Sequence, residues 1–444
     1  MKKSLLIVVS LVIFVFISSM AGAQTKEVVI VTSFPKELFE AYKKAFEVKY
    51  PGVKVVIQQK PTTQGVTYIR ETAAKPDTDL MWASAVDAFQ VLKTDKLLAK
   101  YDLTKEIASR IPPKVGAFPV HDPDGFFFGF ALSGYGMMWN KPYLQTHKVK
   151  PPKEWTDLVD PSYFGHLSIS APSRSGTTHL TVESILQAYG WDKGWALLLN
   201  MGGNMAVVTE RSFGVPEGVN NGQYGIGIVI DFFGLSAIAS GFPVDFAYPS
   251  LTPIVPANVG IVKGGPNPEN AKRFVNYLLS EEGQMLLFKP EIGRLPVIPE
   301  LYVKAPGGYP NPFKMKLGGL DFNSELSSLR YSIVNPLFDQ IITFRLNELK
   351  EAWGAIYKAE KAIEEGKKKG KDVTKAIGMV AEARSLATKV PVTEAQAKDK
   401  EFNKAFLPKE KTETRAKLET QWDATAKANY SKAKELATKA MEAI

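Results

Sequence analysis

Residues 171–180 read Ala-Pro-Ser-Arg-Ser-Gly-Thr-Thr-His-Leu, between a short apolar segment at 167–169 and an apolar run with helical spacing at 180–189. Small hydroxyl residues and a glycine at such a strand-to-helix junction leave backbone N–H groups free, and the helix dipole adds partial positive charge there. The junction therefore suits an anion. Its candidate ligands are Ser173, Arg174, Ser175, Gly176 and Thr177. The alternative interpretation is that these hydroxyl groups only cap the following helix.

The first 23 residues have the layout of a secretory signal peptide. Lys2 and Lys3 precede an almost wholly apolar run at 5–17, and Ala21-Gly22-Ala23 forms a small-residue cleavage site. The apolar run is short for a membrane span. We therefore expect a chain that is secreted across the inner membrane, cleaved near Ala23 and periplasmic, with an uncleaved anchor as the alternative.

The composition and the motifs argue against catalysis. The chain has no cysteine, which excludes thiol catalysis and cysteine-bound metals, so the stability of an exported chain must come from a large core. The four histidines lack metal-motif spacing, and His179 is interpreted as a cap or surface residue. Hydrolase elbow, His-Glu-x-x-His, Walker and dinucleotide-binding motifs are absent. We expect a protein that is not an enzyme and needs no cofactor or metal.

The formal charge of +9 is concentrated at the end of the chain, where residues 341–444 hold 22 Lys/Arg against 16 Asp/Glu. Basic and acidic residues alternate there along predicted helices, which is typical of solvated faces. We therefore expect no binding of nucleic acid.

Strands and helices alternate through the first 300 residues. Buried-type strands are predicted at 28–31, 53–57, 80–83, 167–169, 206–208, 225–230 and 257–262, with helices between them. This alternation indicates an α/β fold with mostly parallel sheets covered by helices.

Beyond residue 319 the pattern becomes helical. Apolar stripes are carried by Ile342 to Ile356, by Val373, Ile377 and Val380, and by a long helix from about Thr412. We expect residues 320–444 to form a helical extension laid on the body of a monomer. A coiled-coil dimerisation arm is the alternative, although its apolar seam is short and rich in alanine.

Five phrases carry a resemblance to a known family. They are Val-Thr-Ser-Phe-Pro at 31–35, Trp-Ala-Ser at 82–84, Pro-Ser-Arg-Ser-Gly-Thr at 172–177, Gly-Ile-Gly-Ile-Val-Ile-Asp at 225–231 and Leu-Leu-Ser-Glu-Glu-Gly-Gln at 278–284. The chain resembles the extracellular solute-binding proteins of bacterial ABC importers, in particular the type II family of ferric-ion, phosphoglycerate and sugar-phosphate binders. The helical tail is similar to that of the longer members.

The resemblance implies a two-lobed type II periplasmic-binding-protein fold with two crossover strands and a C-terminal α-helical extension. Lobe I would comprise residues 25–128 and 250–305, and lobe II residues 135–245. A solute would bind in the interlobe cleft by hinge closure and be delivered to the permease transmembrane subunits, which a cytoplasmic ATPase drives.

The residues of the cleft favour a small organic anion carrying phosphate, phosphonate or carboxylate. Thr32, Ser33 and Ser84 would join residues 173–177 in binding its oxygens. Arg211 would add charge-assisted bonds, with a surface ion pair to Glu210 as the alternative. Asp231 would accept from a hydroxyl or amine of the solute or hold an arginine, unless it caps the next helix. Side chains that would flank the organic part, or belong to the core instead, are Tyr135, Phe232 and Tyr248.

Two other functions remain as alternatives. Ferric-binding relatives use an adjacent tyrosine pair where this chain has Phe232 and Phe233, and phenylalanine cannot coordinate a metal. A sensor that reports solute to a membrane histidine kinase is the second alternative.

Overall fold

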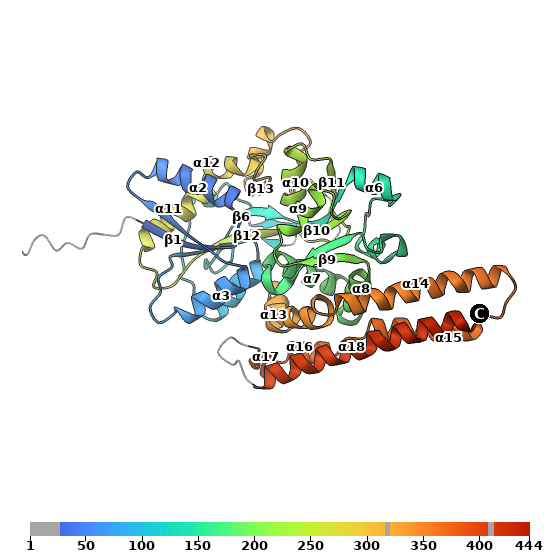
Figure 1. Cartoon of the computed structure of the whole chain (residues 1–444). Coiled ribbons are helices and arrows are strands. Elements are labelled where there is room, and N and C mark those ends of the chain that lie inside the picture. The colour runs from blue at the N-terminus through green and yellow to red at the C-terminus, as the bar shows by residue number, and fades with distance from the viewer. Residues whose placement is uncertain (1–26, 117, 316–319, 407–412) are drawn as a thin grey trace, which may run out of the picture.

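The computed structural model describes residues 27–116, 118–315, 320–406 and 413–444, so the expected signal peptide at 1–23 lies outside the described residues. The expected architecture is confirmed: two α/β lobes stand side by side, and long C-terminal helices lie along them (Figure 1). No helix in the described part of the chain combines the length and apolar character needed to cross a membrane.

Lobe I is built on a six-stranded sheet in the order β13-β6-β12-β3-β1-β2. Its apolar runs are buried because helices cover the sheet. The strands are β1 (Glu27–Thr32), β2 (Lys54–Gln59), β3 (Leu80–Ala83), β6 (Phe128–Ser133), β12 (Val255–Ile261) and β13 (Leu295–Pro296). The helices are α2 (Lys36–Lys49), α3 (Thr62–Glu71), α4 (Val86–Thr94), α5 (Lys105–Ala108), α11 (Pro268–Leu279), α12 (Glu281–Met285), η4 (Leu286–Phe288) and η5 (Pro299–Lys304). A separate hairpin pairs β4 (Lys114–Val115) with β5 (Phe118–Pro119).

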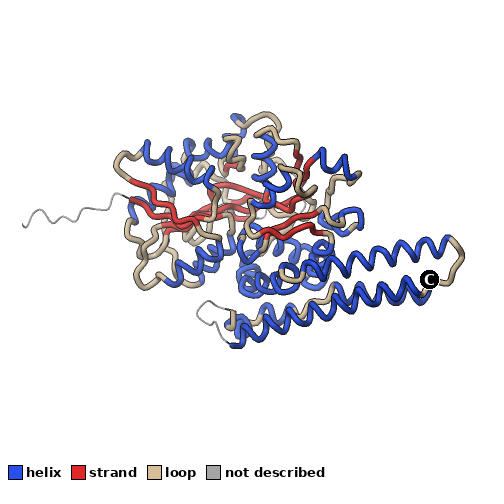
Figure 2. Tube along the Cα trace, in the orientation of Figure 1, coloured by secondary structure: helices blue, strands red, loops and turns tan. Residues whose placement is uncertain are grey.

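Lobe II is built on a five-stranded sheet in the order β11-β7-β10-β8-β9. Its strands are β7 (Tyr135–Asn140), β8 (Leu167–Ser170), β9 (Met205–Thr209), β10 (Ile226–Ile230) and β11 (Val244–Ala247). Its helices are α6 (Lys141–His147), η1 (Trp155–Val159), η2 (Pro161–Tyr163), η3 (Pro172–Arg174), α7 (Gly176–Tyr189), α8 (Trp191–Gly203), α9 (Gly214–Asn220) and α10 (Asp231–Ala239). Figure 2 shows the strands of both sheets inside a shell of helices.

The two sheets are mixed, so the expectation of mostly parallel sheets is wrong. The chain passes from β6 into β7 at Gly134 and returns from β11 to β12 through residues 248–254. The strands that carry these crossings pair antiparallel with their neighbours, whereas β1 with β2 and β3, and β8 with β9 and β10, remain parallel. On the basis of these strands we propose that lobe I comprises residues 25–128 and 250–305 and that lobe II comprises residues 135–245.

The extension is a layer of helices packed mainly on lobe II. It comprises α13 (Ser324–Phe338), a π-helical turn η6 (Asp339–Thr343), α14 (Leu346–Lys368), α15 (Thr374–Ala387), α16 (Glu394–Lys398), α17 (Lys400–Lys404) and α18 (Glu413–Glu442). Most of the stripe expected from Ile342 to Ile356 is buried: Leu349, Trp353 and Ile356 in α14 and Ile342 in η6 are buried, and Leu346 is half-buried. A Cβ atom at Gly203 of α8 would lie 2.2 Å from the Trp353 ring, so only glycine permits this close approach.

The expected stripe on α15 is wrong in its middle. Ile377 is 43% exposed, while Val373, Ala376 and Val380 are buried. Small alanine side chains let α15 pack closely on α18, so the buried face is turned away from Ile377.

Candidate ligand site between the lobes

A small cavity lies between the lobes, where the carboxyl ends of β1, β3, β8, β9 and β10 face one another. This is where open α/β sheets bind ligands. Its volume of about 20 Å³ leaves room for about one water molecule. The lining residues are Ser33, Phe34, Pro35, Pro61, Thr62, Ser84, Arg174, Ser175, Gly176, Thr177, Arg211, Ser212, Phe213, Phe232, Phe233 and Arg294.

Most of the candidate residues meet around this cavity. Those that line it are Ser33, Ser84, Arg174, Ser175, Gly176, Thr177, Arg211 and Phe232. Those that do not are Thr32, Ser173, Asp231 and Tyr248. That the first group binds a solute stays a prediction. Each residue of the second group makes hydrogen bonds within the protein instead.

Thr32 and Ser173 are used by the fold. The Thr32 hydroxyl donates to the Trp82 carbonyl oxygen at 2.7 Å and accepts from the Phe34 N–H at 3.2 Å, so it shapes the turn after β1. The Ser173 carbonyl oxygen accepts from the Thr63 hydroxyl at 2.6 Å. Because Thr63 belongs to lobe I, this bond joins the lobes beside the cavity.

The lobes are in direct contact at the start of α7. A Cβ atom at Gly176 would lie 2.7 Å from Ala85 Cβ and 2.8 Å from Thr62 Oγ1, both on lobe I. The Ser175 hydroxyl accepts from the Thr178 N–H at 3.2 Å and caps α7, so this residue both caps the helix and lines the cavity. In this structure the two lobes therefore touch each other beside the cavity.

Hydroxyl groups of lobe I also line the cavity. Ser33 accepts from the Thr62 hydroxyl at 3.0 Å. Ser84 does not cap α4, because Ala85 is the residue before the helix. The Ser84 hydroxyl instead accepts from Arg294.

The ion pair considered as the alternative for Arg211 is made by Arg174 instead. Arg174, which is 49% exposed, forms an ion pair with Glu210, which is 69% exposed. Arg211 makes no ion pair with Glu210, and its guanidinium lies 5.0 Å from the centre of the Phe213 ring. Burial lowers the pKa of Arg211, and Arg174 adds to this effect while Glu210 opposes it.

Arg294 is a buried cation in the wall of the cavity, and sequence reasoning missed it. Its side chain is 0% exposed and lies over the Phe232 ring at 3.6 Å and the Phe34 ring at 4.5 Å. Nη1 donates to the Ser84 hydroxyl at 3.3 Å, whereas Nε and Nη2 are buried without a hydrogen-bond partner in the described part of the protein. Burial lowers the pKa of Arg294 to about 9, although Asp231 raises it. The signal in the sequence was an arginine inside the apolar segment 292–298.

Asp231 lies at the crossovers and not on the cavity wall. Its Oδ2 accepts from the Gly134 N–H and the Tyr248 hydroxyl, each at 2.8 Å, while Oδ1 is buried without a partner among the described residues. Burial raises the pKa of Asp231 to about 6, against the lowering effect of these hydrogen bonds and Arg294. Asp231 is the first residue of α10 and not its cap. It therefore bonds to both crossover segments.

His179 is not a surface residue, so that interpretation is wrong. Its ring is 0% exposed and lies 2.9 Å from Asp87 of α4. The reason is tertiary, since α13 covers this face of α7.

None of the residues that line this cavity carries a carboxylate, an imidazole or a phenol group. The described residues contain no cluster of three or more His, Cys, Asp or Glu side chains placed to hold a metal. Tyr135 and Tyr248 do not line the cavity, and burial raises the pKa values of both well above the usual value.

Comparisons with known proteins agree with this geometry. Residues 78–322 match the family model described as bacterial extracellular solute-binding protein. The chain is 30% identical over 390 residues to the phosphoglycerate transport regulatory protein PgtC of Salmonella typhimurium, covering 86% of this chain and 92% of the relative.

Two solved structures share the fold. The periplasmic binding protein AfuA of Actinobacillus pleuropneumoniae, with fructose 6-phosphate bound, is 22% identical with a TM-score of 0.60, covering 74% of this chain and 97% of AfuA. Iron-bound HitA of Pseudomonas aeruginosa is 19% identical with a TM-score of 0.56, covering 68% of this chain and 97% of HitA. The two-lobed fold, the cavity between its lobes and the family match lead to one conclusion: this chain belongs to the bacterial extracellular solute-binding proteins, a periplasmic family of ABC transport whose members bind solutes and are not enzymes.

Proposed function

We propose that this chain is the receptor of an ABC importer for a small organic anion that carries phosphate, phosphonate or carboxylate. The single observation that supports this most is the guanidinium of Arg294, which lies fully buried beside the cavity with Nε and Nη2 unpaired. An unpaired buried cation is costly, and an anion that pairs with it would remove that cost.

The surroundings of Arg294 suit an oxyanion. Hydroxyl groups of Ser33 and Ser84 stand on lobe I, and Ser175 and Thr177 stand at the start of α7 on lobe II. A helix N-terminus favours negative charge, and with donors from both lobes the anion would add to the stability of the closed form. The chain would close on the solute and present it to the permease. A cytoplasmic ATPase would drive transport through that permease.

Asp231 supports a second feature of the solute. Its Oδ1 is buried without a partner, and it interacts electrostatically with Arg294. Because Asp231 does not line the cavity, it would act through its charge: near this carboxylate a hydroxyl or amine of the solute is favoured over a further negative group. We therefore propose a hydroxylated or aminated organic anion, such as a phosphoglycerate, a sugar phosphate or an aminophosphonate.

A thermal-shift screen followed by calorimetry tests this function. The compounds are 3-phosphoglycerate, fructose 6-phosphate, 2-aminoethylphosphonate and inorganic phosphate, with glycerol and ferric citrate as controls. A specific ligand raises the melting temperature by mass action. We expect at least one organic anion to bind more tightly than inorganic phosphate; a shift with ferric citrate alone, together with a visible tyrosinate absorption band, would replace this proposal by iron binding.

A sensing function is the second candidate, and one observation favours it. The relative named a transport regulatory protein matches 86% of this chain, so the match extends well beyond the two lobes. Deleting the gene separates the two functions, because loss of uptake of a radiolabelled solute indicates a receptor for import. Loss of solute-induced transcription with uptake retained, when the transporter is expressed from an independent promoter, indicates a sensor.

A further inference from the structure

The C-terminal extension is bonded to lobe II through α7 and α8. Arg330 of α13 pairs with Glu183 of α7, with Nη2 and Oε2 2.6 Å apart and both side chains buried. The indole N–H of Trp191 donates to the Val392 carbonyl oxygen at 2.9 Å. With the close packing of Trp353 on Gly203, these contacts make the extension a structural part of lobe II.

One helix of the extension, α13, also reaches lobe I. The Ser327 hydroxyl donates to Asp87 Oδ2 on α4 at 2.8 Å, and His179 Nε2 on α7 lies 2.9 Å from the same oxygen. All three side chains are 0% exposed. Asp87 is therefore a carboxylate of lobe I that is bound by lobe II and by the extension at once.

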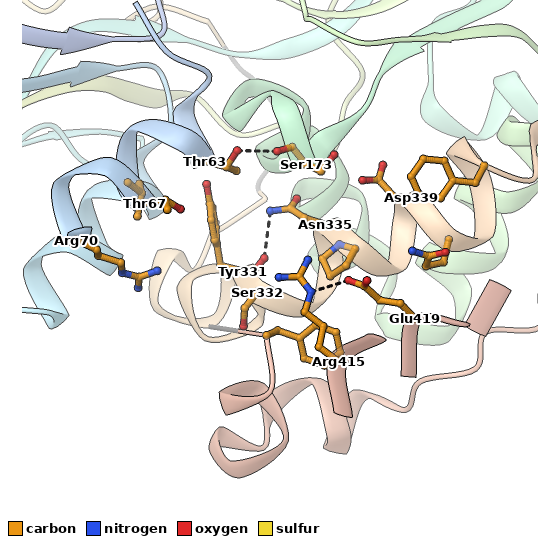
Figure 3. A pocket seen from close by; sticks show the side chains of 15 residues that line it. Thr63, Thr67, Arg70, Ser173, Tyr331, Ser332, Asn335, Asp339, Arg415 and Glu419 are labelled. Carbon is orange, nitrogen blue, oxygen red and sulfur yellow. Dashed lines mark hydrogen bonds and ion pairs between the residues drawn. The ribbon is translucent and has the colours of Figure 1, made fainter. Parts of the chain in front are cut away.

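The groove beside this cluster shows how the three parts meet (Figure 3). Thr63 of α3 faces Ser173 of lobe II, and Asn335 and Tyr331 of α13 lie next to them. Among these contacts the bond from Thr63 to Ser173 joins the two lobes, so opening the cleft would break it.

The hydrogen-bond geometry requires a charged His179. Asn335 Nδ2 donates to the Tyr331 carbonyl oxygen at 3.1 Å, so Asn335 Oδ1 is the acceptor that lies 2.8 Å from His179 Nδ1. The other ring nitrogen faces the Asp87 carboxylate. Because both nitrogens face acceptors, both must carry a proton.

The electrostatic surroundings agree with this protonation. Burial alone lowers the pKa of His179, but Asp87, Glu183 and the Asn335 side chain outweigh it, and the net shift is upward. Asp87 of α4 and Glu183 of α7 interact electrostatically with His179, and the ring of Tyr331 of α13 packs against it. Further out, Arg330 of α13 pairs with Glu183 and with Glu394 of α16, and Tyr135 of β7 interacts with Asp87.

We propose that the His179 imidazolium, the Asp87 carboxylate and the Ser327 hydroxyl form a latch that holds the two lobes closed in the absence of solute. The extension excludes water from the ion pair, which strengthens its attraction in the low-dielectric interior. Opening the cleft separates the two charges. This inference goes beyond the proposed function, because it concerns the balance of open and closed forms and not the identity of the solute.

Spin-label distance measurements on the solute-free, full-length protein test the latch. The chain has no cysteine, so Lys44→Cys on α2 and Ser240→Cys after α10 place two labels without background. Both positions are exposed, one on each lobe. For the wild-type latch at pH 6 we expect one short distance that corresponds to the closed form.

Asp87→Asn removes the charge and keeps the size of the side chain. We expect a second, longer distance and a closed-to-open ratio at least about tenfold lower, because the buried imidazolium loses its partner. Ser327→Ala should cause a smaller change in the same direction. Asp124→Asn is the matched control, since this exposed carboxylate pairs with Lys93 within lobe I.

Changing the pH gives a second measurement that needs no variant. Since the pKa of His179 is raised, the latch is fully formed below about pH 6.5 and weakens as the pH rises through the shifted value. The longer distance should therefore grow between pH 6 and pH 9 in the wild-type protein, and Asp87→Asn should lack this change. If Asp87→Asn does not fold, as judged by circular dichroism, the pH series of the wild-type protein decides the question.

Unchanged distances in the Asp87→Asn protein, or an open wild-type protein at pH 6, would overturn the latch. Neither result would affect the proposed function, which is tested by solute binding. Loss of anion binding with the closed form retained would reject the proposed function and leave the latch in place.

Discussion

Replacement of Arg294 by methionine should change stability and solute binding in opposite directions. Methionine is unbranched and apolar, so it can lie between the rings of Phe34 and Phe232 that now flank the guanidinium. Removing a buried charge that has two unpaired donors should raise the free energy of unfolding of the solute-free protein by about 1–4 kcal/mol.

The loss of binding follows from the same two donors. A hydrogen bond to a charged group contributes about 1.5–3 kcal/mol, so losing the bonds from Nε and Nη2 should weaken anion binding by about 3–6 kcal/mol. This corresponds to a dissociation constant roughly a hundred-fold to ten-thousand-fold higher. Lysine at this position should restore only part of the affinity, because one ammonium group cannot form a bidentate pair.

Urea denaturation without solute and isothermal titration calorimetry with the anion found in the thermal-shift screen measure the two effects. Arg273→Met is the matched control, since Arg273 is exposed on α11 and distant from the cavity lining. Wild-type affinity in Arg294→Met would refute the assignment of Arg294 to anion binding. A variant that loses both stability and binding would show that Arg294 has a structural role instead.

Three further predictions concern closure, the extension and pH. Gly176→Ala should weaken solute binding about tenfold or more and favour the open form in small-angle scattering, because its Cβ would meet lobe I, whereas Gly378→Ala, at a position with open space, should leave binding unchanged. Gly203→Ala should lower the free energy of unfolding by about 1–3 kcal/mol and make the extension more sensitive to protease, because the new methyl group would overlap Trp353. Since burial raises the pKa of Asp231 to about 6, the free energy of unfolding should fall by up to about 3 kcal/mol between pH 4 and pH 7, and urea denaturation of Asp231→Asn should show a flatter profile.

The sequence identified the cavity residues that directly follow strands, but it did not identify Arg294. Ser33, Ser84 and residues 174–177 follow strands directly, and the ends of parallel strands must meet at one edge of a sheet. Arg294 stands far from them in the sequence, before the short strand β13. No local pattern separates such an arginine from one on the surface, because its burial depends on helices and aromatic rings contributed by other segments.

The burial of His179 also could not be predicted from its neighbours in the sequence. Its neighbours in the sequence indicated a helix start, which is confirmed for α7, but they could not show that α13 would cover this face. The protonation of the ring depends on Asp87 and Asn335, which lie 92 and 156 residues away along the chain. Only folding brings these groups together.

By itself, the sequence determined the α/β class, the order of the elements, the helical extension and the strand ends that surround the cavity, because each depends on local periodicity and turn chemistry. Only the tertiary structure decided the mixed pairing of the sheets, the buried guanidinium of Arg294, the position of Asp231 at the crossovers and the ion pair between the lobes. The physical reason is that burial and electrostatic pairing depend on which distant segments exclude water from a side chain, and that is a property of the packed chain and not of its neighbours in the sequence.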